Sequence, residues 1–296
     1  MSKIIYFLIL FFALLSCKSV VPEMLPAPSV GDTLYIATYN VRIDVNSDRG
    51  DRAWAVRLPS VVRIIQEQGF QIVGVQELIN IKQEKELAAL LPGYARFSRG
   101  RDDQAGDSGE RLALFYRKDR FAALDSGFFF LSETPDVVSR GWDAALNRIC
   151  QWVRFNDKIS NQQFYVFNAH FDHVGVQARA GSAALIVERI KAIAGEMPVV
   201  CMGDFNASPA EVGVYKTMST ALSDSRQYAL KKTIPTEGTY NAWDVSRTSF
   251  PESVRIDYVF TQGLEVQEYR TINVRWAEGS YPSDHFPVLM VGRIAQ

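Results

Sequence analysis

Six apolar, strand-like runs of this sequence carry a polar residue at or near one end. The polar residues, in chain order, are Asn40, Glu77, His170, Asp204 with Asn206, Asp257, and Asp284 with His285. A single residue of this kind is explained by a turn or a cap, but six separate runs are harder to explain that way. Because neighbouring strand ends meet at one edge of a sheet, the pattern favours a fold that gathers these side chains on one rim.

Acids dominate this set, which contains Glu77, Asp204, Asp257 and Asp284. Their mutual repulsion on one rim would be costly without a cation. Mg²⁺ accepts carboxylate and amide oxygens, keeps several waters and commonly bridges to a substrate phosphate. The thiolates and clustered histidines that favour zinc are missing from the set. We therefore expect Mg²⁺, with Mn²⁺ or Ca²⁺ as alternatives.

The segments between these runs alternate between helical and strand-like patterns. Residues 52–69, 81–93 and 177–194 have helical character, and the first of them stops at Gly69. A turn at residues 157–161 between two strand-like runs predicts a hairpin. Ser208, Pro209 and Glu211 fit a capping box, which predicts a helix that starts there. With 296 residues and 47% hydrophobic composition, one domain of an α/β or two-sheet kind can hold the chain.

The N-terminus reads as an export signal. Lys3 precedes an apolar run at residues 4–15, which is too short to span a bilayer comfortably, and a small residue precedes Cys17. This arrangement resembles a bacterial lipoprotein signal, with an ordinary cleaved signal and a chance Cys as the alternative. We expect a signal peptide at 1–16, a Pro-rich linker at 17–32 and one domain at 33–296. Lipid on Cys17 would anchor the chain to a membrane of the cell envelope, outside the cytoplasm.

The remaining cysteines and the charge balance are less informative. Cys150 and Cys201 lie inside apolar runs, so two buried free thiols are favoured over a disulfide. There are 32 basic and 33 acidic residues, which gives a formal charge of -1. A nucleic-acid partner is therefore possible but not favoured, because no strongly basic surface is evident.

Six motifs resemble those of the endonuclease/exonuclease/phosphatase superfamily, and they occur in the family's order. They are TYN at 38–40, QE at 76–77, NAH at 168–170, GDFN at 203–206, the Asp of RIDYVF at 257, and SDH at 283–285. Each motif alone is weak, but the ordered set is specific and spans the chain from about Thr33. The resemblance implies a four-layer α/β sandwich, DNase I-like, in which two mostly antiparallel sheets pack together with helices outside. It also implies a metal-dependent phosphoric ester hydrolase, which we expect to be a monomer.

The resemblance assigns the metal and water to one group of residues. Glu77 would be the principal Mg²⁺ ligand with Asn40 beside it, and Asp284 a second metal or water ligand. Asp204 would orient and deprotonate the attacking water, while Asn206 would hold that water or a phosphoryl oxygen. Such a site suits in-line displacement, in which positioning and charge stabilisation do most of the work.

The histidines complete the implied site. His285, oriented by Asp257, would contact the scissile phosphate. His170 would be a candidate general acid for the leaving oxygen. The spacing of NAH resembles the DNase I, sphingomyelinase and phosphatase branches more than the apurinic endonucleases, which makes a repair nuclease less favoured.

Four further residues are candidates for substrate binding: Tyr116, Arg148, His173 and Arg179. Each has a plain alternative. Tyr116 is alternatively a core aromatic, Arg148 a solvated charge at a strand end, His173 a structural histidine, and Arg179 a surface residue of a helix. Trp54 reads as a packed aromatic, with stacking on a ligand as the alternative.

Three functions remain open from the sequence. The first is an exported metal-dependent phosphoesterase acting on a phosphodiester or phosphomonoester. The second is an extracellular nuclease of the DNase I kind. The third is a catalytically inactive binding lipoprotein, which would require a lost catalytic residue. The polar loop at 101–110 and the segment at 241–253 are the expected specificity elements.

Overall fold

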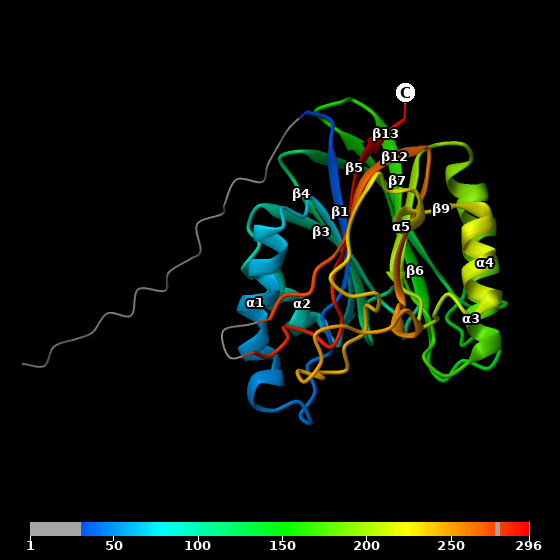
Figure 1. The fold of residues 1–296 in the computed structure, drawn as a ribbon. Coiled ribbons are helices and arrows are strands. Elements are labelled where there is room, and N and C mark those ends of the chain that lie inside the picture. The colour runs from blue at the N-terminus through cyan, green and yellow to red at the C-terminus, as the bar shows by residue number, and fades with distance from the viewer. Residues whose placement is uncertain (1–30, 276–278, 296) are drawn as a thin grey trace, which may run out of the picture.

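The computed structural model describes residues 31–275 and 279–295. Two mixed β-sheets form the centre of the fold (Figure 1). The first sheet has the order β10-β12-β13-β1-β2-β4-β3, and the second has the order β5-β6-β7-β8-β11-β9. Most neighbouring strands are antiparallel, and the parallel pairs are β1 with β2, β7 with β8 and β10 with β12. The predicted signal peptide and most of the predicted linker lie outside the described residues.

The strands are β1 (Leu34–Asn40), β2 (Ile72–Leu78), β3 (Tyr94–Gly100), β4 (Arg111–Arg117), β5 (Phe121–Phe130), β6 (Ile149–Asp157), β7 (Gln163–His170), β8 (Val199–Asp204), β9 (Ser223–Asp224), β10 (Lys231–Thr233), β11 (Asp257–Gln262), β12 (Leu264–Thr271) and β13 (Val288–Ile294). The α-helices are α1 (Trp54–Glu67), α2 (Ile81–Ala89), α3 (Val176–Ala194), α4 (Val212–Ala221) and α5 (Ser225–Tyr228). Two short 3-10 helices are η1 (Gly50–Arg52) and η2 (Glu252–Val254). No helix in the described ranges has the length and apolar content to cross a bilayer.

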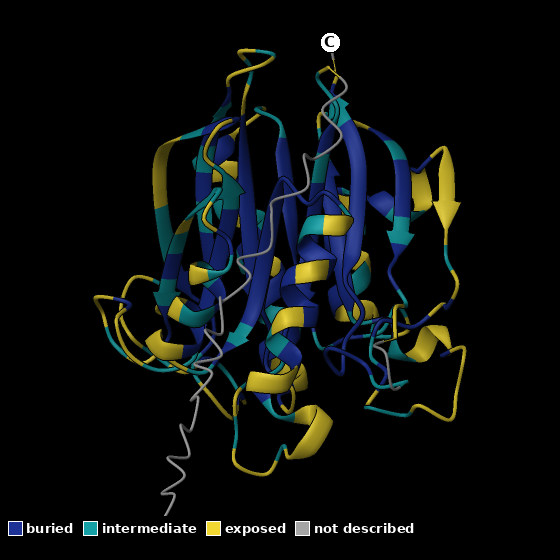
Figure 2. Ribbon diagram, turned by 90° about the vertical axis from the view of Figure 1, so that its left-hand side faces the viewer, coloured by how far each residue is buried: buried dark blue, intermediate teal, exposed yellow. Residues whose placement is uncertain are grey.

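Three apolar cores separate four layers. One core lies between the two sheets and includes Ile36, Val166 and Met202. A second fills the space between the first sheet and helices α1 and α2. A third lies between the second sheet and helices α3 and α4. The helices are buried on the side that faces a sheet and exposed on the other (Figure 2). The expected four-layer sandwich is confirmed.

Several local predictions are confirmed by the structure. Helix α1 is followed by Gly69 at φ +67°, a left-handed conformation that glycine adopts without steric cost. Strands β6 and β7 form the predicted hairpin. Trp54 is buried in the core beneath α1, and Cys150 and Cys201 are buried free thiols in the described part of the chain.

The capping box predicted at Ser208 is wrong. Helix α4 begins at Val212, and no side chain caps its N-terminus. The Glu211 carboxylate, which the capping box would have directed back to its own helix, instead accepts hydrogen bonds from Arg179 at 2.8 and 2.9 Å. The Arg179 guanidinium offers the Glu211 carboxylate two hydrogen bonds and a full opposite charge, whereas a backbone N–H would offer a single hydrogen bond.

The sandwich has two distinct ends. Strand β1 starts beside the C-terminal part of β13, where Leu34 pairs with Gly292, and it runs away from there to Asn40. Both termini of the described chain therefore lie at one end, and Asn40 lies at the other (Figure 1). The other polar residues that ended the apolar runs gather at the Asn40 end, which is called the catalytic rim below.

Candidate active site

Strand ends from both sheets build the catalytic rim. In the second sheet, Asp204 at the end of β8 pairs with His170 at the end of β7 and with Asp257 at the start of β11. In the first sheet, β1 ends at Asn40, and Glu77 lies near the end of the adjacent β2. His285 precedes β13 and joins them through contacts with both sheets. The sequence prediction that these ends meet is thus confirmed as geometry.

Asn40 lies at the centre of the cluster and is fully buried. Its Nδ2 donates to Glu77 Oε1 at 2.9 Å and to Asp204 Oδ2 at 3.0 Å. The same nitrogen lies 3.5 Å from His285 Nε2. Its Oδ1 accepts from the backbone N–H of Arg42 at 3.0 Å. In this arrangement Asn40 holds two carboxylates together, and its own oxygen faces a backbone donor.

Two sets of potential metal ligands occur among the described residues. One is Glu77, His170 and Asp204, and the other is Asp204, Asp257 and His285; within each set the ligand atoms lie within 4.8 Å of one another. Asp204 belongs to both sets, so it is the residue on which the rim is centred. Burial first, and then the charge of Asp257, raise the pKa of Asp204.

Asp257 and His285 form a buried pair. Asp257 Oδ2 lies 2.9 Å from His285 Nδ1, which leaves Nε2 facing the rim. Burial alone would lower the pKa of His285, but the carboxylates of Asp257 and Asp204 outweigh it and hold that pKa well above its ordinary value. The two carboxylates therefore favour the charged form of His285, whose charge is available to an anion.

His170 has the opposite character. Its Nδ1 lies 3.2 Å from Glu110 Oε1, and its Nε2 lies 3.6 Å from Asp204 Oδ2. Burial first, and then the charge of Arg148, lower the pKa of His170 to about 3. A neutral His170 that donates from Nδ1 to Glu110 presents Nε2 as an acceptor. The two histidines thus differ in charge, as expected when one site needs two proton-handling roles.

Asn206 and Asp284 lie beside this centre. The Asn206 backbone N–H donates to Asp204 Oδ1 at 2.9 Å, and its Nδ2 donates to the Phe171 carbonyl oxygen at 3.0 Å. Asp284 Oδ2 lies 3.7 Å from Arg42 Nη1, and Asp284 is in neither of the two ligand sets. Burial first, and then the charge of Glu77, raise the pKa of Asp284.

Arg148 and His173 form a basic pair near the rim. Arg148 Nη2 lies 3.0 Å from His173 Nδ1, Arg148 Nε donates to Asp172 Oδ2 at 3.4 Å, and Arg148 Nη1 lies 3.8 Å from Glu110 Oε1. Arg148 is only 4% exposed, so it is not a solvated strand-end charge. His173 is exposed. Because Glu110 also contacts His170, the structure brings Arg148 and His173 next to the catalytic cluster.

Arg179 and Tyr116 are placed differently. Arg179 is buried, and it donates hydrogen bonds to Glu211 and to the Asp172 carbonyl oxygen. The bond to Glu211 links α3 to the loop after β8. Tyr116 pairs with Ile72, at the opposite end of β2 from Glu77, and packs edge-on against Phe155 at 4.9 Å between ring centroids. The structure does not bring Tyr116 to the rim, and it gives Arg179 a structural partner.

Sequence reasoning missed two residues that contact the histidines. Glu110 closes the polar loop at 101–110 and also accepts from Arg101 Nη1 at 2.7 Å. Tyr240 lies with its ring centroid 5.0 Å from that of His285 and forms a backbone bridge with it. Both belong to long irregular segments, where neither period nor strand end marks a residue. The ending of the acidic loop in Glu110, just before an apolar run, is the one signal available.

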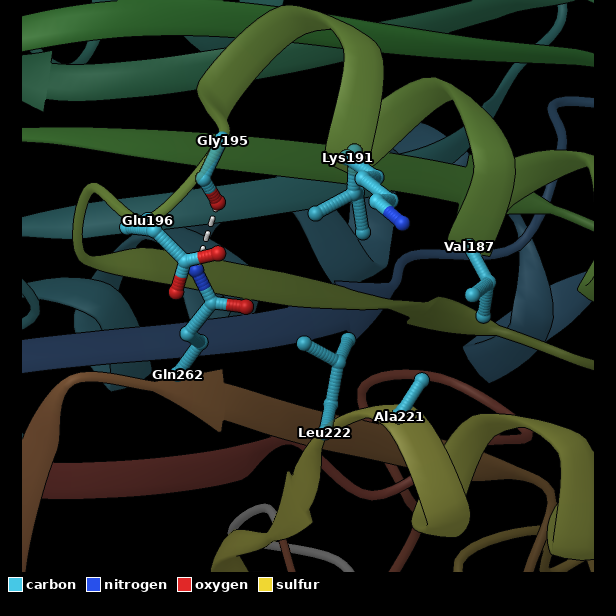
Figure 3. Close-up of a pocket in the computed structure, with 8 residues that line it drawn as sticks. Val187, Lys191, Gly195, Glu196, Ala221, Leu222 and Gln262 are labelled. Atoms are coloured by element: carbon cyan, nitrogen blue, oxygen red, sulfur yellow. Dashed lines mark hydrogen bonds between the residues drawn. The ribbon is translucent and has the colours of Figure 1, made fainter.

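A separate cavity of about 160 Å³ lies at the other end of the sandwich. Figure 3 shows the residues that line it. The C-terminal ends of α3 and α4 and the end of β11 line it, and Gln262 Nε2 donates to the Gly195 carbonyl oxygen at 2.9 Å there. Because β11 begins at Asp257 and ends at Gln262, this cavity is remote from the rim.

Comparison with known proteins agrees with this geometry. The model of the endonuclease/exonuclease/phosphatase family matches residues 37–285, which include every residue of the rim. The chain belongs to this family. The match also covers Glu110, Arg148 and Tyr240, so the loops that complete the site lie inside the family domain.

Solved structures of similar sequence support the same fold. An endonuclease/exonuclease/phosphatase family protein from Bacteroides thetaiotaomicron is 37% identical, with a TM-score of 0.82 over 90% of this chain and 100% of that one. A mannosyl-6-phosphatase from Bacteroides thetaiotaomicron VPI-5482 is 39% identical, with a TM-score of 0.80 over 87% of this chain and 98% of that one. Among curated sequences, an uncharacterized protein of Acanthamoeba polyphaga mimivirus is 25% identical over 255 residues, 80% of this chain and 91% of that protein. Family membership and the similarity to a phosphatase support a phosphoesterase.

Proposed function

We propose that this protein is a divalent-metal-dependent phosphoesterase that hydrolyses its substrate by in-line attack of an activated water. One observation carries the proposal. Asn40, from the first sheet, donates to Glu77 of its own sheet and to Asp204 of the other sheet, within reach of protonated His285. An acidic pair beside a fixed cation of the protein is the arrangement that a metal ion and a phosphate would together complete.

The side chains present fit a hard cation. The rim offers carboxylate oxygens from Glu77 and Asp204, and Asp257 Oδ1 is buried without a hydrogen-bond partner. No cysteine takes part in either ligand set found in the described chain. Glu77 and Asp204 would hold the ion, with Asn40 keeping them together and Asp284 nearby. A bound Mg²⁺ would supply charge to the phosphoryl oxygens and lower the pKa of a coordinated water.

We assign the remaining residues roles that their placement supports. Asp204 orients the attacking water and accepts its proton, with Asn206 fixed to Asp204 through its backbone. His285, charged and held by Asp257, stabilises the negative charge that grows on the phosphoryl oxygens. His170, neutral and held at Nδ1 by Glu110, is placed to take the water's proton from Asp204 at Nε2 and to pass it to the leaving oxygen. Arg148 and His173 bind an anionic or hydroxyl-rich part of the substrate.

A sugar phosphate is the substrate class that we favour. The support is the 39% identity to a mannosyl-6-phosphatase over nearly the whole of both chains. A nuclease is less well supported, because the formal charge of -1 gives no general attraction to a phosphate backbone. An inactive binding protein would require a missing catalytic residue, and each one is present in the sequence.

We further propose that the protein is a lipoprotein of the cell envelope, anchored outside the cytoplasm through Cys17. The support is the sequence around Cys17 alone. Labelled fatty acid should be incorporated into wild-type protein and not into Cys17→Ser, which should leave the membrane fraction. Labelling of the variant, or an unlabelled wild type in the membrane fraction, would count against the anchor.

Hydrolysis by the purified protein tests the reaction. Phosphate release from p-nitrophenyl phosphate and mannose 6-phosphate should require Mg²⁺, stop with EDTA and fall at least about 100-fold in His285→Ala. Glu265→Gln, an exposed carboxylate at the far end of the sandwich, should behave as wild type. Activity that survives both EDTA and His285→Ala would refute the mechanism. Preferential nicking of plasmid DNA or cleavage of bis-p-nitrophenyl phosphate would show that the substrate is a phosphodiester and not a phosphomonoester.

A further inference from the structure

A layer of buried polar side chains lies between the inter-sheet core and the catalytic rim. It consists of Thr38 on β1, Gln76 on β2, Gln151 on β6 and Asn168 on β7, each 0% exposed. On β7 the inward positions are Phe164, Val166, Asn168 and His170, so the strand passes from apolar core to amide to catalytic histidine. Burying an amide costs free energy unless the amide is hydrogen-bonded. We therefore asked which hydrogen bonds these buried side chains make.

Strand β2, which carries Gln76, has an irregular register. Val75 pairs with Ala113 of β4, but the next pair is Leu78 with Arg111, so Gln76 and Glu77 together face the single residue Leu112. This is a β-bulge, and such bulges re-aim side chains next to active sites. Glu77 has a φ of +63°, a left-handed conformation that is uncommon for residues other than glycine.

The bulge determines where Glu77 points. In a regular strand, residues 75 and 77 would share a face, and Val75 packs in the outer core against helices α1 and α2. A regular β2 would thus direct the Glu77 carboxylate towards the helices. With the bulge, Glu77 reaches the rim, where it accepts from Asn40 Nδ2 at 2.9 Å and from the Ile43 backbone N–H at 3.1 Å.

Asn168 holds this bulge from the opposite sheet. Its Nδ2 donates to the carbonyl oxygens of Val75 and Ala113, both at 3.2 Å, which are the last regular pair before the bulge. Its Oδ1 accepts from Gln76 Nε2 at 2.7 Å, so it also grips a residue of the bulge itself. Both polar atoms of the Asn168 side chain therefore bond to β2 or β4, and Nδ2 also lies 3.3 Å from the Gln151 amide oxygen when that oxygen faces it.

Two neighbours of Asn168, Gln151 and Gly74, support its contact with β2 and β4. Gln151, its cross-strand partner on β6, is placed to accept from the backbone N–H groups of Ala113 at 3.1 Å and Leu114 at 3.0 Å when its amide oxygen faces them. Residue 74 on β2 is glycine, and a Cβ there would lie 2.8 Å from Asn168 Oδ1. Gly74 leaves the space that the Asn168 amide fills.

We infer that Asn168 is a positioning residue for Glu77: by holding the bulge of β2 from the second sheet, it sets the affinity of the rim for its divalent cation. The inference rests on the proposed function, because it takes Glu77 as a ligand of that cation. Asn168 itself touches neither cation nor substrate. Residues that orient metal ligands in this way typically change metal affinity by about 10- to 100-fold when they are replaced.

Mn²⁺ binding, measured by titration calorimetry without substrate, tests the inference in the full-length protein. Asn168→Leu keeps the approximate size of the side chain and removes its hydrogen bonds, and it should raise the Kd for Mn²⁺ about 10- to 100-fold. Gly74→Ala should raise the Kd in the same direction by displacing the Asn168 amide, although residue 74 contacts nothing in the rim. The Mg²⁺ concentration for half-maximal activity should rise in parallel, with a smaller change in kcat at saturating Mg²⁺.

Val166→Ala is the matched control for a general loss of stability. Val166 is fully buried and faces inward two residues before Asn168, and its truncation lowers the melting temperature without touching the bulge. It should bind Mn²⁺ as wild type does at temperatures where it is folded. Unchanged Mn²⁺ affinity in folded Asn168→Leu or, if that variant does not fold, in folded Gly74→Ala would overturn the inference, as would an equal loss in Val166→Ala. No Mn²⁺ binding by wild type, or wild-type binding by Glu77→Gln, would overturn the proposed role of Glu77 and the inference with it.

Discussion

Asn40 Nδ2 lies 3.0 Å from Asp204 Oδ2, and this hydrogen bond joins the ends of β1 and β8, two strands that belong to different sheets. The same nitrogen donates to Glu77. A single amide therefore sets the separation of the two carboxylates proposed to hold the cation, and the geometry of the rim depends on how the two sheets pack.

Replacement of Asn40 should weaken metal binding and catalysis together. Asn40→Ala leaves two carboxylates without their common donor, and we expect Mg²⁺ affinity to fall about 10- to 100-fold. Asn40→Asp adds a third negative charge and should lower kcat further. Activity measured against Mg²⁺ concentration gives both values. Asn156→Ala, an amide near the far end of β6, should match wild type; an Asn40→Ala enzyme with normal Mg²⁺ dependence would contradict the prediction.

Asp204→Asn should exchange activity for stability. The pKa of Asp204 is raised by burial and by Asp257, so at pH 7 its charge destabilises the metal-free protein. This penalty is present above the raised pKa and disappears as the pH falls through it. In EDTA at pH 7 we expect Asp204→Asn to melt at a higher temperature than wild type, with the difference shrinking towards pH 4, while activity is lost. Equal melting temperatures at pH 7 in EDTA would refute this account.

Asp257→Asn should move the pH profile of activity. The Asp257 carboxylate raises the pKa of His285, so its removal lets His285 lose its proton at a lower pH. We expect the alkaline limb of kcat/KM to shift towards acid and kcat to fall about 100-fold or more, because His285 also loses its orienting partner. An unshifted alkaline limb would mean that another group controls it.

Arg148 and Arg179 should separate into a binding residue and a structural one. Arg148→Ala removes a basic group beside the rim and should raise KM about 10-fold with a smaller change in kcat. Arg179→Ala breaks a two-bond pair with Glu211 and should lower the melting temperature, with KM nearly unchanged. Steady-state kinetics and thermal unfolding of both variants decide it; a raised KM in Arg179→Ala would restore its predicted role in substrate binding.

A buried ion pair far from the rim should give acid-sensitive stability. Asp157 accepts from Arg120 Nε and Nη2, both at 2.9 Å. Burial alone would raise the pKa of Asp157, but Arg120 outweighs it and the net pKa is lowered. Its contribution is complete above the unfolded-state pKa of about 3.9 and is lost as the pH falls through the lower folded value. Asp157→Asn should therefore cost about 3 kcal/mol at pH 7 and much less near pH 2, by urea unfolding. An equal cost at both values would contradict the ion-pair account.

The polar rim was predictable because strand ends are marked in a sequence. Apolar runs that stop at Asn40, His170 and Asp204 identify both the strand and its end, and the family motifs add their roles. The direction of Glu77 was not predictable in the same way. It depends on a bulge opposite Leu112, and the pairing of β2 with β4 is a long-range property that no local pattern encodes.

Residues in irregular segments escaped prediction for a related reason. Glu110 and Tyr240 reach the histidines through loops whose path is set by tertiary contacts. The helix cap predicted at Ser208 and Glu211 was wrong because the Glu211 carboxylate pairs with the distant Arg179 and not with its own helix. Local sequence patterns predicted the helices and strands, but contacts between distant segments determine the orientation of these side chains.

The polarity of β1 has a consequence for how the enzyme would meet its substrate. Strand β1 begins at Leu34, and its seven residues carry the chain roughly 20 Å to Asn40 at the catalytic rim. A tether attached through Cys17 would join the domain on the side away from its chemistry. The catalytic rim would then face away from the membrane, and the linker would not obstruct it. Such an orientation would favour soluble phosphorylated molecules over the headgroups of the anchoring membrane.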